Sequence, residues 1–218
     1  QIVTVPVTIA IASTTPASPS NNQTPVVNVT GAGDAQTVKI FDGTTQVGTG
    51  TSAAAGTAAI TTTSLADGSH SLTASVTNQT SPAVTYVVDV TKPKVSSAAS
   101  ASLTKVTVTF NENMNCASIG TATWTIKDIS AVAAGATITA AGVPTATGGT
   151  LDCLTATVTA STALTNGTQY TVAVTGGTDA AGNTTDTAAS SATFVSSDTT
   201  APTATSAAFQ SATTIKIT

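Results

Sequence analysis

The chain has 218 residues, of which 40% are hydrophobic, 3% aromatic and 7% charged, and its net charge is -4 at neutral pH. Its basic residues are six lysines spread singly along the sequence, with no arginine. This excludes nucleic-acid binding, because phosphate recognition needs clustered cations. Membrane insertion is excluded as well, since no stretch reaches the ~18 to 20 consecutive apolar residues that span a bilayer.

The first part of the sequence predicts a series of short antiparallel strands. Apolar and polar residues alternate with period two, and clusters of Gly, Asn, Asp, Ser and Pro separate the runs. Asp42-Gly43 predicts a tight hairpin turn, because it supplies the positive φ angles that such a turn requires. The run 2–11 has two interpretations, the first strand of a domain or a donor strand for a neighbouring subunit, and we favour the first. The expected strands are 5–11, 26–29, 37–41, 71–76 and 84–88.

A second series of strands follows Pro93. Phe110, Trp124 and Phe194 are among the largest side chains of this part, and we expect all three to anchor a core. Helical periodicity is nearly absent from the whole sequence. The expected strands are 105–110, 123–126, 136–139, 154–158, 170–174 and 192–195.

An internal repeat divides the sequence. The pattern Asp-x-Thr-x-Pro occurs at 89–93 and again 109 residues further on, at 198–202. At the same offset, 97–99 matches 206–208 and 106–109 matches 215–218. A self-similar period of this length indicates tandem domains. We therefore predict domains at 1–92 and 93–198 and the first strands of a truncated third domain at 199–218, within a longer parent protein.

Motifs in both domains carry a family resemblance. The first domain contains VKIFDG at 38–43, VGT at 47–49 and LADGSH at 65–70, and it resembles the Ig-like repeats of bacterial surface adhesins. The second contains VTVTFNENM at 106–114 and DAAGN at 179–183, and it resembles the Ig-like repeats of bacterial S-layer proteins. The resemblance implies an all-β fold of tandem immunoglobulin-like antiparallel β-sandwiches with an extracellular, cell-surface location.

The two cysteines, Cys116 and Cys153, fall in the second domain. A metal site or a catalytic thiol is disfavoured, because two cysteines without a nearby histidine provide neither four ligands nor a base. We predict a disulfide between them, and the alternative is two buried free thiols. The cysteines are not part of the repeat pattern described above.

No cofactor is expected, and calcium is the one possibility that the sequence leaves open. Asp89 and Asp198 occupy equivalent positions at the two domain junctions, and Asp179 and Asp186 lie in a nearby loop. Calcium takes six to eight oxygen ligands and stiffens joints between extracellular domains. We name Asp89, Asp198 and Asp179 as candidate ligands. The alternative is that the aspartates cap turns while Thr and Pro stiffen the linker without a metal.

Catalysis is not expected. The single histidine, His70, lies in a predicted turn, and no Ser-His-Asp grouping or carboxylate pair is visible. Short Asn-x-Ser/Thr sequons fit an exposed surface protein but arise readily by chance in a chain this rich in Asn and Thr. The sequons are at Asn22, Asn28, Asn78, Asn166 and Asn183.

We predict a non-enzymatic structural protein of a bacterial or archaeal surface, an S-layer or fibre component that assembles into homo-oligomers or a lattice. The low charge density favours close lateral packing of subunits, and surface glycans are further candidate contacts. Two alternatives remain open. One is an adhesin stalk that extends a distant binding domain, and the other is a spacer in a secreted polysaccharide-acting enzyme.

Overall fold

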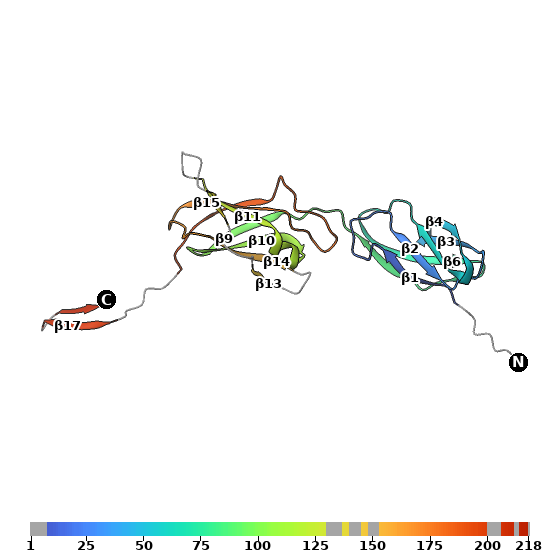
Figure 1. Cartoon of the computed structure of the whole chain (residues 1–218), viewed down its shortest axis with the longest axis horizontal. Helices are drawn as coiled ribbons and strands as arrows, with labels where there is room; N and C mark the ends of the chain where they lie inside the picture. Colours follow the sequence, from blue (N-terminus) through green and yellow to red (C-terminus); the bar gives the residue numbers. More distant parts are fainter. Residues whose placement is uncertain are drawn as a thin grey trace.

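The computed structural model describes residues 8–129, 137–139, 145–147, 153–199, 206–211 and 214–217. Within these residues the fold is all-β, as predicted, with two β-sandwiches joined end to end by a short segment (Figure 1). The named strands pair antiparallel throughout. The predicted domain limits at 92 and 198 stay a prediction.

The first sandwich packs a three-stranded sheet against a five-stranded sheet. Its elements are β1 Ala10–Thr15, β2 Val26–Thr30, β3 Thr37–Asp42, β4 Thr45–Thr51, the 3-10 helix Ala54–Gly56, β5 Ala58–Thr61, β6 Gly68–Val76, β7 Gln79–Thr80 and β8 Val84–Val88. The smaller sheet has the order β1-β2-β5, and in the larger sheet the order is β4-β3-β6 with β7 and β8 both paired to β6. A parallel bridge between Ser20 and Val88 ties the segment after β1 to the last strand.

Period-two alternation explains why these segments form strands around one core. In β3, Val38 and Ile40 are fully buried while Thr37 and Lys39 are exposed. Successive side chains on a strand point to opposite faces, so this pattern directs one face of the sheet inward. Tyr86 of β8 is also fully buried, and its hydroxyl donates to the carbonyl of Asn22 at 3.1 Å.

The second sandwich packs two four-stranded sheets, with strand orders β13-β14-β10-β9 and β12-β11-β15-β16. Its elements are β9 Val95–Ser102, β10 Lys105–Met114, α1 Cys116–Thr121, β11 Thr123–Asp128, β12 Thr137–Thr139, β13 Thr145–Thr147, β14 Cys153–Thr159, β15 Gln169–Thr175 and β16 Ser191–Val195. Phe110, Trp124 and Phe194 are buried in its core, as expected. Phe110 and Trp124 meet edge to face, with their ring centroids 6.3 Å apart.

The structure also repeats the pattern that the sequence shows at an offset of 109 residues. Strands β17 Ala207–Ser211 and β18 Thr214–Ile217 form a hairpin in which Ala207 pairs with Ile217. In the second sandwich, Ala98 of β9 pairs with Val108 of β10 in the equivalent register. The two hairpins also share an irregularity at the same place, next to the turn. Residues 200–205, 212–213 and Thr218 of the predicted third domain lie outside the described residues.

Several elements differ from the sequence prediction. Among the described residues the first strand begins at Ala10, so residues 8–9 of the predicted strand are not part of it. Residues 5–7 of that prediction lie outside the described residues, as does residue 136 of the predicted strand 136–139. Strands β5 and β9 were not predicted, because β5 has only four residues, two of them alanine, and β9 consists mainly of serine and alanine, so that both give little alternation. Helix α1 was also missed, since six residues are too few to show a helical period.

Candidate metal site between the two sandwiches

The segment between the sandwiches is short and is held at both ends. On the first side, the N–H of Asp89 donates to the carbonyl of Ser20 at 3.1 Å. On the second side, the carbonyl of Pro93 accepts an N–H of the second sandwich at 2.8 Å, and the Pro93 ring is buried. These bonds place the end of the first sandwich directly against the loops of the second.

Three carboxylates meet at this junction. Asp89 follows the last strand of the first sandwich, Glu112 lies on β10, and Asp179 lies in the loop after β15. One carboxylate oxygen from each lies within 4.8 Å of the others. Asp179 is only 3% exposed, whereas Asp89 and Glu112 are half-buried. We call Asp89, Glu112 and Asp179 the junction cluster.

Asp179 is fixed by the loop that it opens, which we call the junction loop (179–183). Its carboxylate accepts the backbone N–H and the side-chain amide of Asn183, both at 2.8 Å. Gly182 has a φ of 93°, a conformation that glycine adopts without steric cost and that lets the loop close. A bridge from Met114 to Asp179 then ties the loop to the end of β10.

The electrostatics of the cluster disfavour three bare negative charges. Burial raises the pKa of Glu112, and the charges of Asp89 and Asp179 raise it further, while a hydrogen bond from Asn111 acts in the opposite direction. Within the described part of the chain, no salt bridge to a lysine or histidine neutralises the cluster. A cation at this point would relieve the repulsion between the carboxylates.

The donor set fits a hard cation. Carboxylate oxygens are the ligands that calcium and magnesium prefer, and calcium tolerates irregular geometry with water or carbonyl oxygen completing its shell. The cluster draws one ligand from the first sandwich and two from the second. A cation bound here would therefore link the two sandwiches directly.

The structure brings together two of the three predicted calcium candidates, Asp89 and Asp179. Sequence reasoning missed Glu112, although it lies in the VTVTFNENM motif that was singled out for its family resemblance. The one sequence signal that could have identified Glu112 is that each of the two motifs of the second domain contains an acidic residue. Nothing in the linear spacing places those motifs side by side.

The third candidate, Asp198, lies outside the cluster, and so does Asp186 from the nearby loop. Asp198 is exposed after β16, where its N–H donates to the side chain of Asn166 at 3.2 Å. Asp186 lies 3.9 Å from the ammonium of Lys94.

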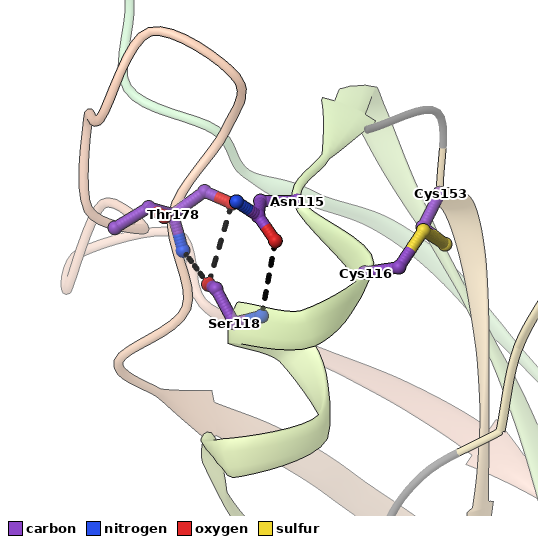
Figure 2. Close-up of a disulfide and its surroundings, with 5 residues drawn as sticks. All are labelled: Asn115, Cys116, Ser118, Cys153 and Thr178. Carbon is purple, nitrogen blue, oxygen red and sulfur yellow. Dashed lines mark hydrogen bonds between the residues drawn. A yellow bond between two sulfur atoms is a disulfide. The ribbon is translucent and has the colours of Figure 1, made fainter. Parts of the chain in front are cut away.

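Cys116 and Cys153 form a disulfide, with their Cα atoms 5.3 Å apart (Figure 2). Cys116 is the first residue of α1, and Cys153 is the fully buried first residue of β14. The bridge therefore attaches the short helix to the sheet that contains β10 and β14.

The helix in turn holds the segment that leads into the junction loop. Asn115 caps α1 by accepting the N–H of Ser118 at 3.2 Å, and its own N–H donates to the carbonyl of Thr178 at 2.8 Å. The Ser118 hydroxyl also hydrogen-bonds to the backbone of Thr178, as Figure 2 shows. Thr178 directly precedes Asp179, so the disulfide and the helix support one edge of the junction cluster.

His70 has a structural environment in the first sandwich. Its Nδ1 lies 2.7 Å from the Asp42 carboxylate in the β3–β4 turn, and its Nε2 lies 2.8 Å from the carbonyl of Ala66. Burial of the ring lowers the pKa of His70, but the hydrogen bonds to Asp42 and Ala66 and the charge of Asp42 outweigh it, so the net pKa is raised. Only the imidazolium can donate to both acceptors at once.

This geometry predicts a pH dependence of stability. Because the folded pKa of His70 is raised, its contribution is fully present below the unfolded pKa and is lost as pH rises through the folded pKa. We therefore expect the first sandwich to melt at a higher temperature at a pH below the unfolded pKa of His70 than at a pH above its folded pKa. The corresponding difference in the free energy of unfolding should be less than about 1 kcal/mol for such a partly exposed pair. The His70→Gln variant should lose this difference when both proteins are followed by calorimetry. An unchanged pH profile in the variant would contradict the assignment.

The five sequons differ in accessibility. Asn183 is only 7% exposed, and its side-chain amide donates to two acceptors, so it does not present a free amide to a glycosyltransferase. Asn78 and Asn166 are exposed. A carbohydrate on the surface would therefore be compatible with the fold at these two positions.

Two antiparallel sandwiches with these strand orders define the class of tandem immunoglobulin-like proteins. Residues 86–197 match the family model described as "Bacterial Ig-like domain". The chain belongs to this family, and the resemblance seen in the sequence is confirmed.

Solved structures of surface proteins are among those similar to this chain. The N-terminal part of the bacterial S-layer protein SbsC is 26% identical, with a TM-score of 0.42, over 55% of this chain and 26% of that one. The BSP domain of a biofilm-associated protein is 21% identical, with a TM-score of 0.29, over 84% of this chain and 29% of that one. The D0-D1 domain of intimin is 14% identical, with a TM-score of 0.26, over 81% of this chain and 92% of that one.

This chain thus spans about a quarter of the length of the SbsC structure. A search of curated protein sequences finds no match. Among the described residues, no helix has both the length and the apolar character needed to cross a membrane.

Proposed function

We propose that this chain is a non-catalytic structural segment of a bacterial cell-surface protein, and that it belongs to an S-layer or extracellular fibre. The observation that carries the proposal is the junction, where hydrogen bonds from both sandwiches hold the connecting segment. Such a joint transmits force along the chain and keeps successive domains in line. Membership of the bacterial Ig-like family supports the same role.

The surface chemistry supports close packing of subunits. Charged residues make up 7% of the chain, and threonine and serine occupy many exposed strand positions. Neighbouring subunits with such faces can approach without strong charge repulsion and can form hydrogen bonds through hydroxyl groups.

An adhesin stalk is the second candidate, since the same end-to-end arrangement of sandwiches also suits a rod that carries a distant binding domain (Figure 1). A spacer in a secreted polysaccharide-acting enzyme is the third. The three differ in what surrounds the segment: a regular assembly, an isolated rod, or a catalytic domain in the same polypeptide.

Electron microscopy of the native full-length protein, on its cell surface and after purification, tests the proposal. A regular lattice or filament is expected for an S-layer or fibre component. Isolated rods would replace the proposal with the stalk. Compact particles without an extended array of domains would contradict both.

We also propose that the junction cluster binds calcium. Support comes from three carboxylates drawn from both sandwiches, one of them almost fully buried, in a place where their charges repel each other. A bound cation would turn this repulsion into a cross-link between the domains. The bound ion would be lost on chelation, and the expected consequences are given in the Discussion.

A further inference from the structure

Hydrogen bonds leave little freedom in the segment that joins the sandwiches. Val90 donates its N–H to the carboxylate of Asp67 at 3.0 Å, which extends the hold of the first sandwich one residue beyond Asp89. Contacts with the second sandwich begin at Pro93 and Lys94. The carbonyl of Pro93 accepts the N–H of Asp186, and the N–H of Lys94 donates to the side chain of Asn111. The stretch between the two holds is only residues 91–92.

The side chain of Asn183 spans the junction. One bond from its amide nitrogen reaches the Asp179 carboxylate within the junction loop at 2.8 Å. The other reaches the main-chain carbonyl of Asp89, in the first sandwich, at 2.7 Å. Asn183 is 7% exposed, so both bonds are largely shielded from water. A buried donor or acceptor left without a partner is costly, so both bonds matter for the stability of the junction.

A second contact joins the same two parts of the molecule. The N–H of Asn21 in the first sandwich donates to the carbonyl of Ala181 in the junction loop at 3.0 Å. Ala181 is 8% exposed, and it lies between Asp179 and Asn183 in a loop that the bridge to Met114 holds in place. The junction loop therefore contacts the end of the first sandwich at two main-chain positions.

We infer that the junction loop is a docking latch for the preceding sandwich, and that Asn183 fixes the relative orientation of the two domains. The latch contacts main-chain atoms of its partner, the carbonyl of Asp89 and the N–H of Asn21. Its partner is thus the end of the β-sandwich from which the chain leaves toward the next domain. The latch binds that end through main-chain atoms, with little dependence on the side chains there.

The cross-junction bonds of this latch do not require a cation. Its two cross-junction bonds use neutral amide and carbonyl groups, and neither involves a carboxylate oxygen of the junction cluster as a ligand. The domains should therefore stay aligned after chelation, and calcium would add to an orientation that already exists.

NMR relaxation and residual dipolar couplings of the whole chain, measured in the presence of a chelator, test this inference. In the wild type, the two sandwiches should share one alignment tensor and tumble with the same correlation time. In Asn183→Ala, they should have separate tensors and shorter correlation times. Asn113→Ala, which alters an exposed asparagine on β10, is the matched control and should behave like the wild type.

A second variant separates the latch from the folding of the loop, because Asn183 also closes the junction loop through Asp179. Asn21→Pro removes the N–H that reaches Ala181 and leaves the loop itself unchanged, so it should loosen the joint without altering the spectrum of the second core. Independent tumbling of the two sandwiches in the wild type would overturn the inference. So would a common tensor retained by both Asn183→Ala and Asn21→Pro.

Discussion

Loss of the Cys116–Cys153 disulfide is expected to lower the free energy of unfolding of the second sandwich by about 4 kcal/mol. The bridge closes a loop with a sequence separation of 37 residues, and the chain-entropy relation gives that magnitude for a loop of this size. The cost should fall on the second sandwich alone, because both cysteines lie in it. The first sandwich should keep its transition.

The chain contains its own reporter for this experiment. Trp124 is the single tryptophan and is buried in the second core, so its fluorescence follows the unfolding of that sandwich only. Denaturant titrations of the wild type, the reduced protein and the double variant Cys116→Ser, Cys153→Ser should show the shift. Calorimetry would follow the first sandwich in parallel. An unchanged Trp124 midpoint, or an equal shift in both sandwiches, would count against a bridge that stabilises one domain.

Calcium is expected to stabilise the junction by about 2.7 kcal/mol when its free concentration is about 100 times its dissociation constant. The ligands come from both sandwiches, so the bound form requires that both are folded and docked. Melting temperatures measured by calorimetry should therefore rise on addition of calcium and fall again with a chelator. Titration calorimetry should give one ion for this junction.

The effect of the Glu112→Gln substitution on stability should depend on whether calcium is present. Without calcium, removal of a charge that Asp89 and Asp179 repel should leave stability unchanged or raise it. With calcium, the variant should gain much less than the wild type because a ligand has been lost. Asp34→Asn, at an exposed position in the first sandwich, is the control and should respond to calcium as the wild type does. Equal calcium effects in Glu112→Gln and the wild type would contradict binding at the junction cluster.

Much of the fold could be predicted because its information is local. Alternation in segments such as 37–41 and 105–110 identifies strands and their inward faces, and the structure buries Val38, Ile40, Val106 and Val108 accordingly. The segments that were missed lack this signal. Strand β9 consists mainly of serine and alanine, and it is held in the sheet by pairing with β10.

The candidate site could be predicted only in part. Equivalent positions in the repeat pointed to Asp89, and a loop motif pointed to Asp179. Glu112 and Asn183 were not assigned to the junction, because each contacts residues that are remote in the sequence. Asp89 and Asn183 are separated by 94 positions, and only the docking of two folded domains brings them together.

The sequence by itself determined the all-β class and the repeat of 109 residues, through short-range alternation and internal similarity, and with two cysteines it limited any internal disulfide to one possible pair. The tertiary structure alone decided which carboxylates form a cluster and how one sandwich holds the next. Those properties depend on loops that are far apart in the sequence and come together at one end of a sandwich. They come together only after each core has packed and the two sandwiches have docked.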